Sequence, residues 1–227
     1  MAAARRICVI GNSSVGAVRM ALGDRPAPSG YEFAFFASGG PKFETIGIAD
    51  DLLVGAEVDS GGDRRLSTYD GFVLHGRLPA AFEALEFERG LGSERYSERV
   101  RALALADWRE GYKSWALGLS LCARYGRPVL AMSRNVFASE RAGSRAERAT
   151  ADATLARLLT PISYAPFPDA LFDEDGSVKR PFYARYVNVH GREGSAASQD
   201  EWHYNREAGG LILDALLSRL DAAFASD

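Results

Sequence analysis

The chain has 227 residues, 47% of them hydrophobic and 25% charged, with a formal net charge of −3. This composition is typical of a soluble globular protein and excludes a chain that is disordered throughout. A net charge this small provides no general attraction to nucleic acid or to an anionic membrane, so we expect neither as a partner.

Length, cysteine content and the apolar runs indicate one cytoplasmic domain. A chain of this length buries one sizeable core, so we expect a single domain over residues 1–227. Cys8 and Cys122 lie in apolar runs, which indicates packing thiols rather than a disulfide framework or a metal site. The apolar run at residues 7–10 is too short for a signal peptide, and no run approaches the ~20 residues of a membrane span.

The predicted elements alternate between strands and helices. Residues 7–10 form a continuous apolar run rich in β-branched side chains, which predicts a strand buried on both faces. A polar turn at residues 11–14 follows, and then a helix. The predicted strands cover residues 7–10, 32–37, 52–54, 71–75 and 128–132. The predicted helices cover residues 15–22, 94–125, 139–159 and 207–224.

The predicted helix over residues 94–125 is the longest. Its apolar side chains recur at spacings of three, four and seven, so we expect one stripe to face a core. Gly111 and Gly118 are candidate interruptions, and Gly126 is the expected end of the helix. The stripe consists of Val100, Leu103, Trp108, Trp115, Leu119 and Cys122.

Residues 161–199 show no strong periodicity. The segment exceeds the usual length of a loop, and we interpret it as a segment that covers a substrate.

Strands separated by helices predict a doubly wound α/β sheet with helices on both faces. Ligands bind such sheets at the carboxyl ends of the strands. This rule directs attention to the turns at residues 11–14, 38–40, 76–78 and 133–135.

The turn at residues 11–16 allows three interpretations. The alternatives are a turn that presents a nucleophilic Ser13, a turn that binds phosphate at a helix N-terminus, and a capped structural turn. A P-loop would require a lysine after Gly16, where Ala17 stands, and a dinucleotide fingerprint would require glycine at position 13.

The other end of the chain favours the nucleophile. Asp200 and His203 are three residues apart just before the last predicted helix, a spacing that brings both side chains to one side of a helical turn. The carboxylate can then orient the imidazole and stabilise its protonated form. The alternative is that His203 only caps the last helix. For His75, at the end of a predicted strand, we expect a packed and hydrogen-bonded side chain.

These two blocks resemble those of the SGNH/GDSL hydrolase superfamily. Its first block is a Gly-Asp-Ser-like turn after the first strand, and residues 11–14 read Gly-Asn-Ser-Ser; its last block is Asp-x-x-His, as at residues 200–203. The resemblance implies a flavodoxin-like three-layer α/β/α sandwich with a mostly parallel sheet. It also implies a catalytic triad of Ser13, Asp200 and His203.

The resemblance further implies oxyanion donors from the Ser13 or Ser14 amide and from a glycine after the second strand. The third block departs from the family pattern, because Leu78 stands where an asparagine is usual after Gly76. Side chains near the predicted pocket would have to replace that asparagine. The candidate oxyanion and pocket residues are Ser14, Gly39, Gly40, Gly76, Arg77, Arg134, Asn135 and Trp202.

The function expected from this pattern is ester hydrolysis through an acyl-enzyme on Ser13, without a metal or another cofactor. The resemblance implies a small-molecule or carbohydrate ester as substrate. Three alternatives remain open: an acyltransferase with the same triad, a weakly active module that binds a glycan or another ligand, and a nucleotide-binding protein. The sequence leaves the oligomeric state open.

Overall fold

The protein is described by a computed structural model that covers residues 3–25, 28, 30–59, 62–92, 95–137, 140, 143–195, 197 and 200–225. Eight strands are assigned in this part of the chain: β1 Arg5–Gly11, β2 Tyr31–Ala37, β3 Gly47–Ala49, β4 Leu52–Val54, β5 Val58–Asp59, β6 Gly71–His75, β7 Val129–Met132 and β8 Ser163–Ala165. The α-helices are α1 Val15–Gly23, α2 Ala81–Gly90, α3 Glu98–Glu110, α4 Lys113–Tyr125, α5 Arg145–Leu159 and α6 Arg206–Ala225. The short 3-10 helices are η1 Gly40–Thr45, η2 Leu66–Thr68, η3 Asp169–Leu171 and η4 Arg180–Tyr183.

The main sheet has six strands in the order β5-β2-β1-β6-β7-β8. Neighbours from β2 to β8 pair in parallel, and β5 pairs with β2 antiparallel at the edge. In chain order, the parallel strands are arranged second, first, third, fourth and fifth, which is the flavodoxin-like doubly wound order. The predicted fold class is therefore confirmed.

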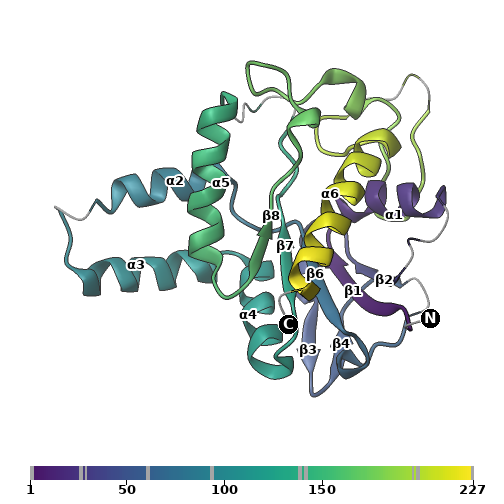
Figure 1. The fold of residues 1–227 in the computed structure, drawn as a ribbon, viewed down its shortest axis with the longest axis horizontal. Helices are drawn as coiled ribbons and strands as arrows, with labels where there is room; N and C mark the ends of the chain where they lie inside the picture. Colours follow the sequence, from purple (N-terminus) through teal and green to yellow (C-terminus); the bar gives the residue numbers. More distant parts are fainter. Residues whose placement is uncertain are drawn as a thin grey trace.

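Helices cover both faces of this sheet, as Figure 1 shows. Successive side chains of β1 point to opposite faces, so Ile7 and Val9 join one core cluster while Cys8 and Ile10 join the other. The first cluster is completed by α1 and α6, and the second by α4 and α5. Two hydrophobic cores on either side of one sheet make a three-layer α/β/α sandwich.

The prediction of one long helix over residues 94–125 is wrong. The chain forms α3 and α4 instead, with a break at Gly111 and Tyr112; position 94 lies outside the described residues. Val100 and Leu103 of the predicted core stripe are 44% and 63% exposed. Trp115 of α4 is fully buried, and Trp108 of α3 packs against the same core cluster.

The reason is a helix that the sequence analysis did not predict. Between β6 and α3 the chain forms α2, whose Phe87 stacks on Trp108 of α3 at a ring-centroid distance of 4.4 Å. In Figure 1, α2 and α3 extend together to one side of the sheet. Phe87 of α2 therefore covers part of the apolar face of α3, while Leu105 and Trp108 of α3 pack against the second core cluster.

The other predicted strands and helices are present, most of them with shifted ends, whereas β3, β5 and β8 were not predicted. Gly126 ends α4 in the left-handed conformation, with φ of 58°. The helix predicted from position 139, which is itself outside the described residues, begins at Arg145 after a cap by Ser144. The segment predicted as a substrate cover begins with β8, the last parallel strand, and its final position 199 is also outside the described residues. Within the residues described, no helix is both long and apolar enough to cross a bilayer.

Candidate active site

The topology creates a crevice between β1 and β6. The chain leaves β1 toward β2 on one side, whereas β6 and the later strands extend the sheet on the other. This is the switch point at which doubly wound sheets bind ligands, outside the carboxyl ends of the strands. The turn after β1, which carries Ser13, and the turn after β6, which carries Arg77, flank this crevice.

The turn that carries Ser13 is held against the end of β6. The Asn12 amide donates to the His75 carbonyl at 3.1 Å, and the Asn12 side chain accepts the Ser14 amide at 3.0 Å. Gly76 makes this fit possible, because a Cβ there would lie 2.3 Å from Asn12 Oδ1. Gly76 therefore lies beneath the turn and supports it.

Ser13 is half-buried and immediately precedes Ser14, the N-cap of α1. Within the described residues, its amide has no hydrogen-bond partner. Gly16, one turn further along, approaches the backbone of the segment after η4, since a Cβ there would lie 2.0 Å from the Asn188 carbonyl oxygen. This close approach brings residues 188–189 to the same opening as Ser13.

Asp200 and His203 form a tight, locally hydrogen-bonded unit. One carboxylate oxygen of Asp200 accepts the amides of Trp202 and His203 at 2.8 and 2.6 Å. The other oxygen contacts His203 Nδ1 at 2.7 Å. The carboxylate thus favours the tautomer that carries its proton on Nδ1 and leaves Nε2 as the proton acceptor.

The local conformation of this unit differs from the expected helical turn. Asp200 and His203 lie in a bend ahead of α6, which begins at Arg206. Asn205, and not His203, caps that helix by accepting the Ala208 amide at 3.0 Å. The capping role considered for His203 is therefore wrong, and its ring is available to the pocket.

The segment after β7 anchors this bend. Asn135 donates its side-chain amide to the Trp202 carbonyl at 3.0 Å, and the Tyr204 hydroxyl accepts the Val136 amide at 3.0 Å. Because these bonds flank His203 on both sides along the chain, they fix the position of its backbone. The His203 ring itself stacks on Tyr186, with ring centroids 5.6 Å apart.

Ser13 and His203 line one open pocket of about 770 Å³. Among the predicted oxyanion and pocket residues, the pocket wall includes Ser14, Gly39, Gly40, Arg77, Arg134, Asn135 and Trp202. Gly76, which lies beneath the Ser13 turn, is the one of these residues that does not line the pocket. Asp200 of the predicted triad does not line it either and is connected to it through His203. The structure thus gathers residues from both ends of the chain at one edge of the sheet.

Hydrogen bonds distinguish among the candidate oxyanion donors. The Ser14 amide is bonded to Asn12, and the Asn135 amide group is bonded to Trp202. The pKa of Glu57 is lowered first by its bond to the Lys42 ammonium and also by the Gly39 amide, so the Gly39 amide faces that carboxylate. The Ser13 amide is without such a partner among the described residues.

Two arginines in the pocket wall lie near acidic side chains. Arg77, with a left-handed φ of 53°, donates to the Gly40 carbonyl at 3.1 Å and lies 3.8 Å from the Glu44 carboxylate. Arg134 forms two bonds to the Glu140 carboxylate, at 3.0 and 2.9 Å. Burial opposes ionisation of Glu140, but the Arg134 guanidinium outweighs it and lowers the pKa of that carboxyl.

The side chain of His75 is buried and does not line the pocket that holds Ser13. Its ring is 1% exposed and, within the described residues, neither ring nitrogen has a hydrogen-bond partner. The expectation of a packed side chain is correct, but the expectation of a hydrogen-bonded one is not. Burial lowers the pKa of His75 to about 4, so the ring is neutral at pH 7.

Sequence reasoning missed several residues of the pocket wall. Tyr112 and Lys113 reach it because α3 and α4 separate at Gly111, and the predicted interruption at Gly111 was the one signal that pointed there. Asn188 and Val189 come from a segment without periodicity. Among the described residues, no three His, Cys, Asp or Glu side chains are grouped as metal ligands would be.

The sequence matches no known family model and no curated protein. Three solved structures share a distant likeness. A candidate acylhydrolase from Bacteroides fragilis is 12% identical, with a TM-score of 0.44 over 96% of this chain and 87% of that chain. A lipase from a goat rumen metagenome is 11% identical, with a TM-score of 0.40 over 94% and 96%. A candidate platelet activating factor protein from Streptococcus pneumonia is 13% identical, with a TM-score of 0.46 over 96% and 85%. At such low identities and TM-scores, these likenesses assign no activity to the chain.

Proposed function

We infer that this protein is a serine ester hydrolase that uses Ser13 as nucleophile, His203 as general base and acid, and Asp200 to orient the imidazole. One observation carries the proposal: Ser13 and His203 line the same pocket, and His203 Nδ1 is bonded to Asp200 at 2.7 Å. An acid–histidine pair beside a serine at the start of a helix is the arrangement that activates a hydroxyl nucleophile.

The reaction follows from the roles of these groups. His203 takes the proton of the Ser13 hydroxyl through Nε2 as the serine oxygen attacks the carbonyl carbon of the ester. The bond to the leaving alcohol then breaks, and His203 returns the proton to that alcohol. A water molecule, activated by the same imidazole, attacks the acyl-enzyme and releases the acid. An acceptor alcohol in place of water would make the protein an acyltransferase.

The negative charge that develops on the carbonyl oxygen requires fixed donors. The Ser13 amide is the first of these, because the N-terminal end of α1 favours negative charge and no described group occupies that amide. The Gly40 amide is the second, because Gly40 lines the same pocket as Ser13. Asn135 acts as a positioning residue for the His203 bend instead of replacing the missing third-block asparagine.

The exposed indole of Trp202 supports a ring-shaped alcohol partner. Trp202 is 59% exposed, lines the pocket and packs on Phe137 with ring centroids 4.5 Å apart. A large aromatic surface held in this way next to the catalytic histidine suits contact with a sugar or another ring on the alcohol side of the ester.

Hydrolysis of 4-nitrophenyl acetate tests the proposal. Ser13→Ala and His203→Ala are each expected to lower kcat at least ~1000-fold, and the double variant no further, because the two side chains act as one unit. Ser177→Ala, which removes a serine hydroxyl that donates to Asp175, is the matched control and is expected to retain the wild-type rate. Turnover by Ser13→Ala at the wild-type rate would remove Ser13 from the mechanism.

A further inference from the structure

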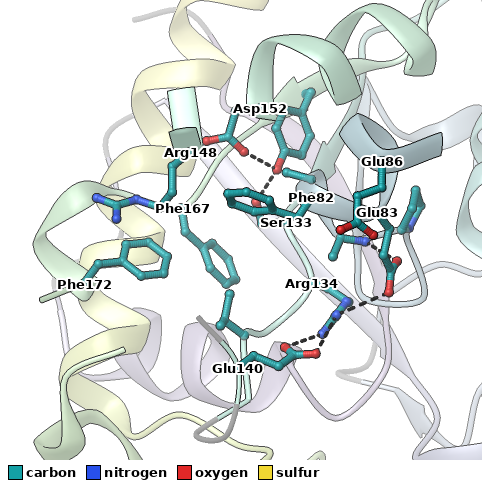
Figure 2. A pocket seen from close by; sticks show the side chains of 15 residues that line it. Phe82, Glu83, Glu86, Ser133, Arg134, Glu140, Arg148, Asp152, Phe167 and Phe172 are labelled. Carbon is teal, nitrogen blue, oxygen red and sulfur yellow. Dashed lines mark hydrogen bonds and ion pairs between the residues drawn. The ribbon is translucent and has the colours of Figure 1, made fainter. Parts of the chain in front are cut away.

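A second, smaller cavity of about 270 Å³ lies beside the candidate active site. It is enclosed by the start of α2, the end of β7, α5 and the chain around η3, and Figure 2 shows its lining side chains. Three residues, Glu83, Arg134 and Glu140, line both this cavity and the pocket that holds Ser13. The two spaces are therefore adjacent, with the Arg134 ion pairs at their boundary.

The walls of this cavity combine an apolar part with charged side chains. Phe82, Phe167 and Phe172 extend into it from three different segments, and together with Val136 they form the apolar part of the wall. The charged lining residues are Glu83, Glu86, Arg134, Glu140, Arg148 and Asp152. Two of the rings are held in place: Phe167 packs edge-on against His75, with ring centroids 6.0 Å apart, and the Arg148 guanidinium lies 4.6 Å above the ring of Phe172. A preformed space with aromatic walls suits an apolar ligand.

The buried polar groups of the cavity are bonded to the protein itself. The Ser133 hydroxyl lies 2.5 Å from the Tyr164 hydroxyl, which in turn donates to Asp152 at 2.9 Å. Arg148 donates to the Gly143 carbonyl at 2.8 Å and to Asp169 at 3.1 Å. Burial raises the pKa of Asp152, which disfavours its charged form. A ligand in this cavity therefore gains its binding energy mainly from apolar contact.

The spacing of the strands gives the approximate distance between Ser13 and the cavity. Ser133 follows β7, which is two strands away from β1, so the cavity floor is displaced by roughly 10 Å at the usual ~4.8 Å between strands. An extended chain advances ~1.2 Å per bond, so an acyl group on Ser13 needs about eight bonds to arrive there. The cavity then has room for about nine groups the size of a water molecule, at ~30 Å³ each.

We propose that this cavity binds the distal end of a long aliphatic acyl chain, which makes the substrate an ester of an acid with roughly twelve to sixteen carbons. The proposal rests on the proposed function, because it places the acyl carbonyl at Ser13. The chain crosses the pocket along β6 and β7, and its end lies between the three phenylalanine rings.

The first measurement is kcat/KM for 4-nitrophenyl esters of acetate, octanoate and dodecanoate. We expect at least a tenfold rise from octanoate to dodecanoate, because each methylene that enters an apolar site contributes roughly a threefold to fourfold gain. A series with the chain on the alcohol side, ethyl acetate against dodecyl acetate, is expected to show no such rise. A gain confined to the alcohol series would overturn the proposal.

Variants that fill the cavity provide the second measurement. Ala81 lines the cavity from the first turn of α2, and Ala81→Phe is expected to lower the ratio of dodecanoate to acetate kcat/KM at least tenfold. Ala49→Phe makes the same change at an exposed position of β3 and leaves that ratio at the wild-type value. Val136→Phe fills the cavity from the β7 side, with Val54→Phe on β4 as its matched control.

Binding without catalysis separates the two proposals. Calorimetry on Ser13→Ala with dodecanoate is expected to show binding that Ala81→Phe weakens at least tenfold. That result without any ester turnover by the wild-type protein would support the cavity and reject the hydrolase. Turnover whose chain-length ratio is the same in wild type, Ala81→Phe and Val136→Phe would support the hydrolase and reject the cavity.

Discussion

At the residue scale, His75 and His203 show how two identical side chains take different roles because their surroundings differ. His203 has a carboxylate at 2.7 Å from Nδ1 and faces an open pocket. His75 is enclosed by the sheet and, among the described residues, its nitrogens bond to nothing. An imidazole in the first setting can exchange protons with a substrate, whereas one in the second is held neutral.

The buried His75 makes stability depend on pH. Its pKa is about 4 in the folded protein and 6.5 in the unfolded chain, so between these values only the unfolded chain binds the proton. The free energy of unfolding therefore falls as the pH is lowered from 6.5 toward 4. By pH 4.5 the loss due to this group is about 2 to 3 kcal/mol. Urea unfolding of the wild-type protein and of His75→Leu, each at pH 7 and pH 4.5, measures this loss of stability.

The comparison with His75→Leu isolates the histidine from the carboxylates, which titrate in both proteins. We expect the variant to lose about 2 to 3 kcal/mol less than the wild type over this interval. It should also be close to wild type in stability at pH 7, since the lost ring nitrogens made no hydrogen bonds. Equal losses in the two proteins would show that His75 has a partner or is solvated.

Sequence analysis predicted the site residues that belong to a local sequence motif. It did not predict the residues that reach the site only through the fold. Ser13, Asp200 and His203 were accessible because a turn after a strand and an Asp-x-x-His block are local patterns. Tyr186 could not be predicted, because its stacking on His203 depends on how a segment without periodicity folds back onto the site. The hydrogen bond from the Asn135 side-chain amide to the Trp202 carbonyl could not be predicted either, because it joins positions 67 residues apart.

At the scale of elements, the close packing of α1 and α6 sets the first helical layer. Gly209 of α6 lies against α1, because a Cβ there would be 2.2 Å from the Ala17 carbonyl oxygen. That atom belongs to the backbone and cannot move aside as a side chain would. Since α1 begins next to Ser13 and α6 follows the His203 bend, this contact also connects the two halves of the site.

Gly209→Ala is therefore expected to lower the free energy of unfolding by about 1 to 3 kcal/mol, despite the better helix propensity of alanine. Gly90→Ala is the matched control. It replaces a glycine at the end of α2 with no atom within 4 Å of the new Cβ, and it should leave stability unchanged or raise it by up to ~1 kcal/mol. Urea unfolding measures both variants. Equal effects would contradict the helix contact.

The error over residues 94–125 also belongs to this scale. Apolar periodicity indicates that a helix has a buried face, but it does not say what buries it. Trp108 fitted the predicted stripe, yet its ring stacks on Phe87 of α2. No local signal distinguished a neighbouring helix from the sheet, so the stripe was assigned to the core although Leu103 is 63% exposed.

At the scale of the whole molecule, the order of the strands creates the site. The predicted alternation of strands and helices was sufficient to predict a doubly wound sheet and to direct the search for a site to the carboxyl ends of its strands. The short strand β8 was not found, because its three residues lie within the aperiodic segment. The second cavity was also beyond sequence reasoning, since its walls come from α2, β7 and the chain near η3.

The most direct measurement is the position of covalent modification by a fluorophosphonate, located by peptide mass spectrometry on the folded wild-type protein. A phosphonyl adduct on the Ser13 hydroxyl, absent from His203→Ala, is the expected result, because only a serine with a working base attacks phosphorus rapidly. An adduct on Ser14 or on any other residue, or folded protein that the probe leaves unmodified, would contradict the account.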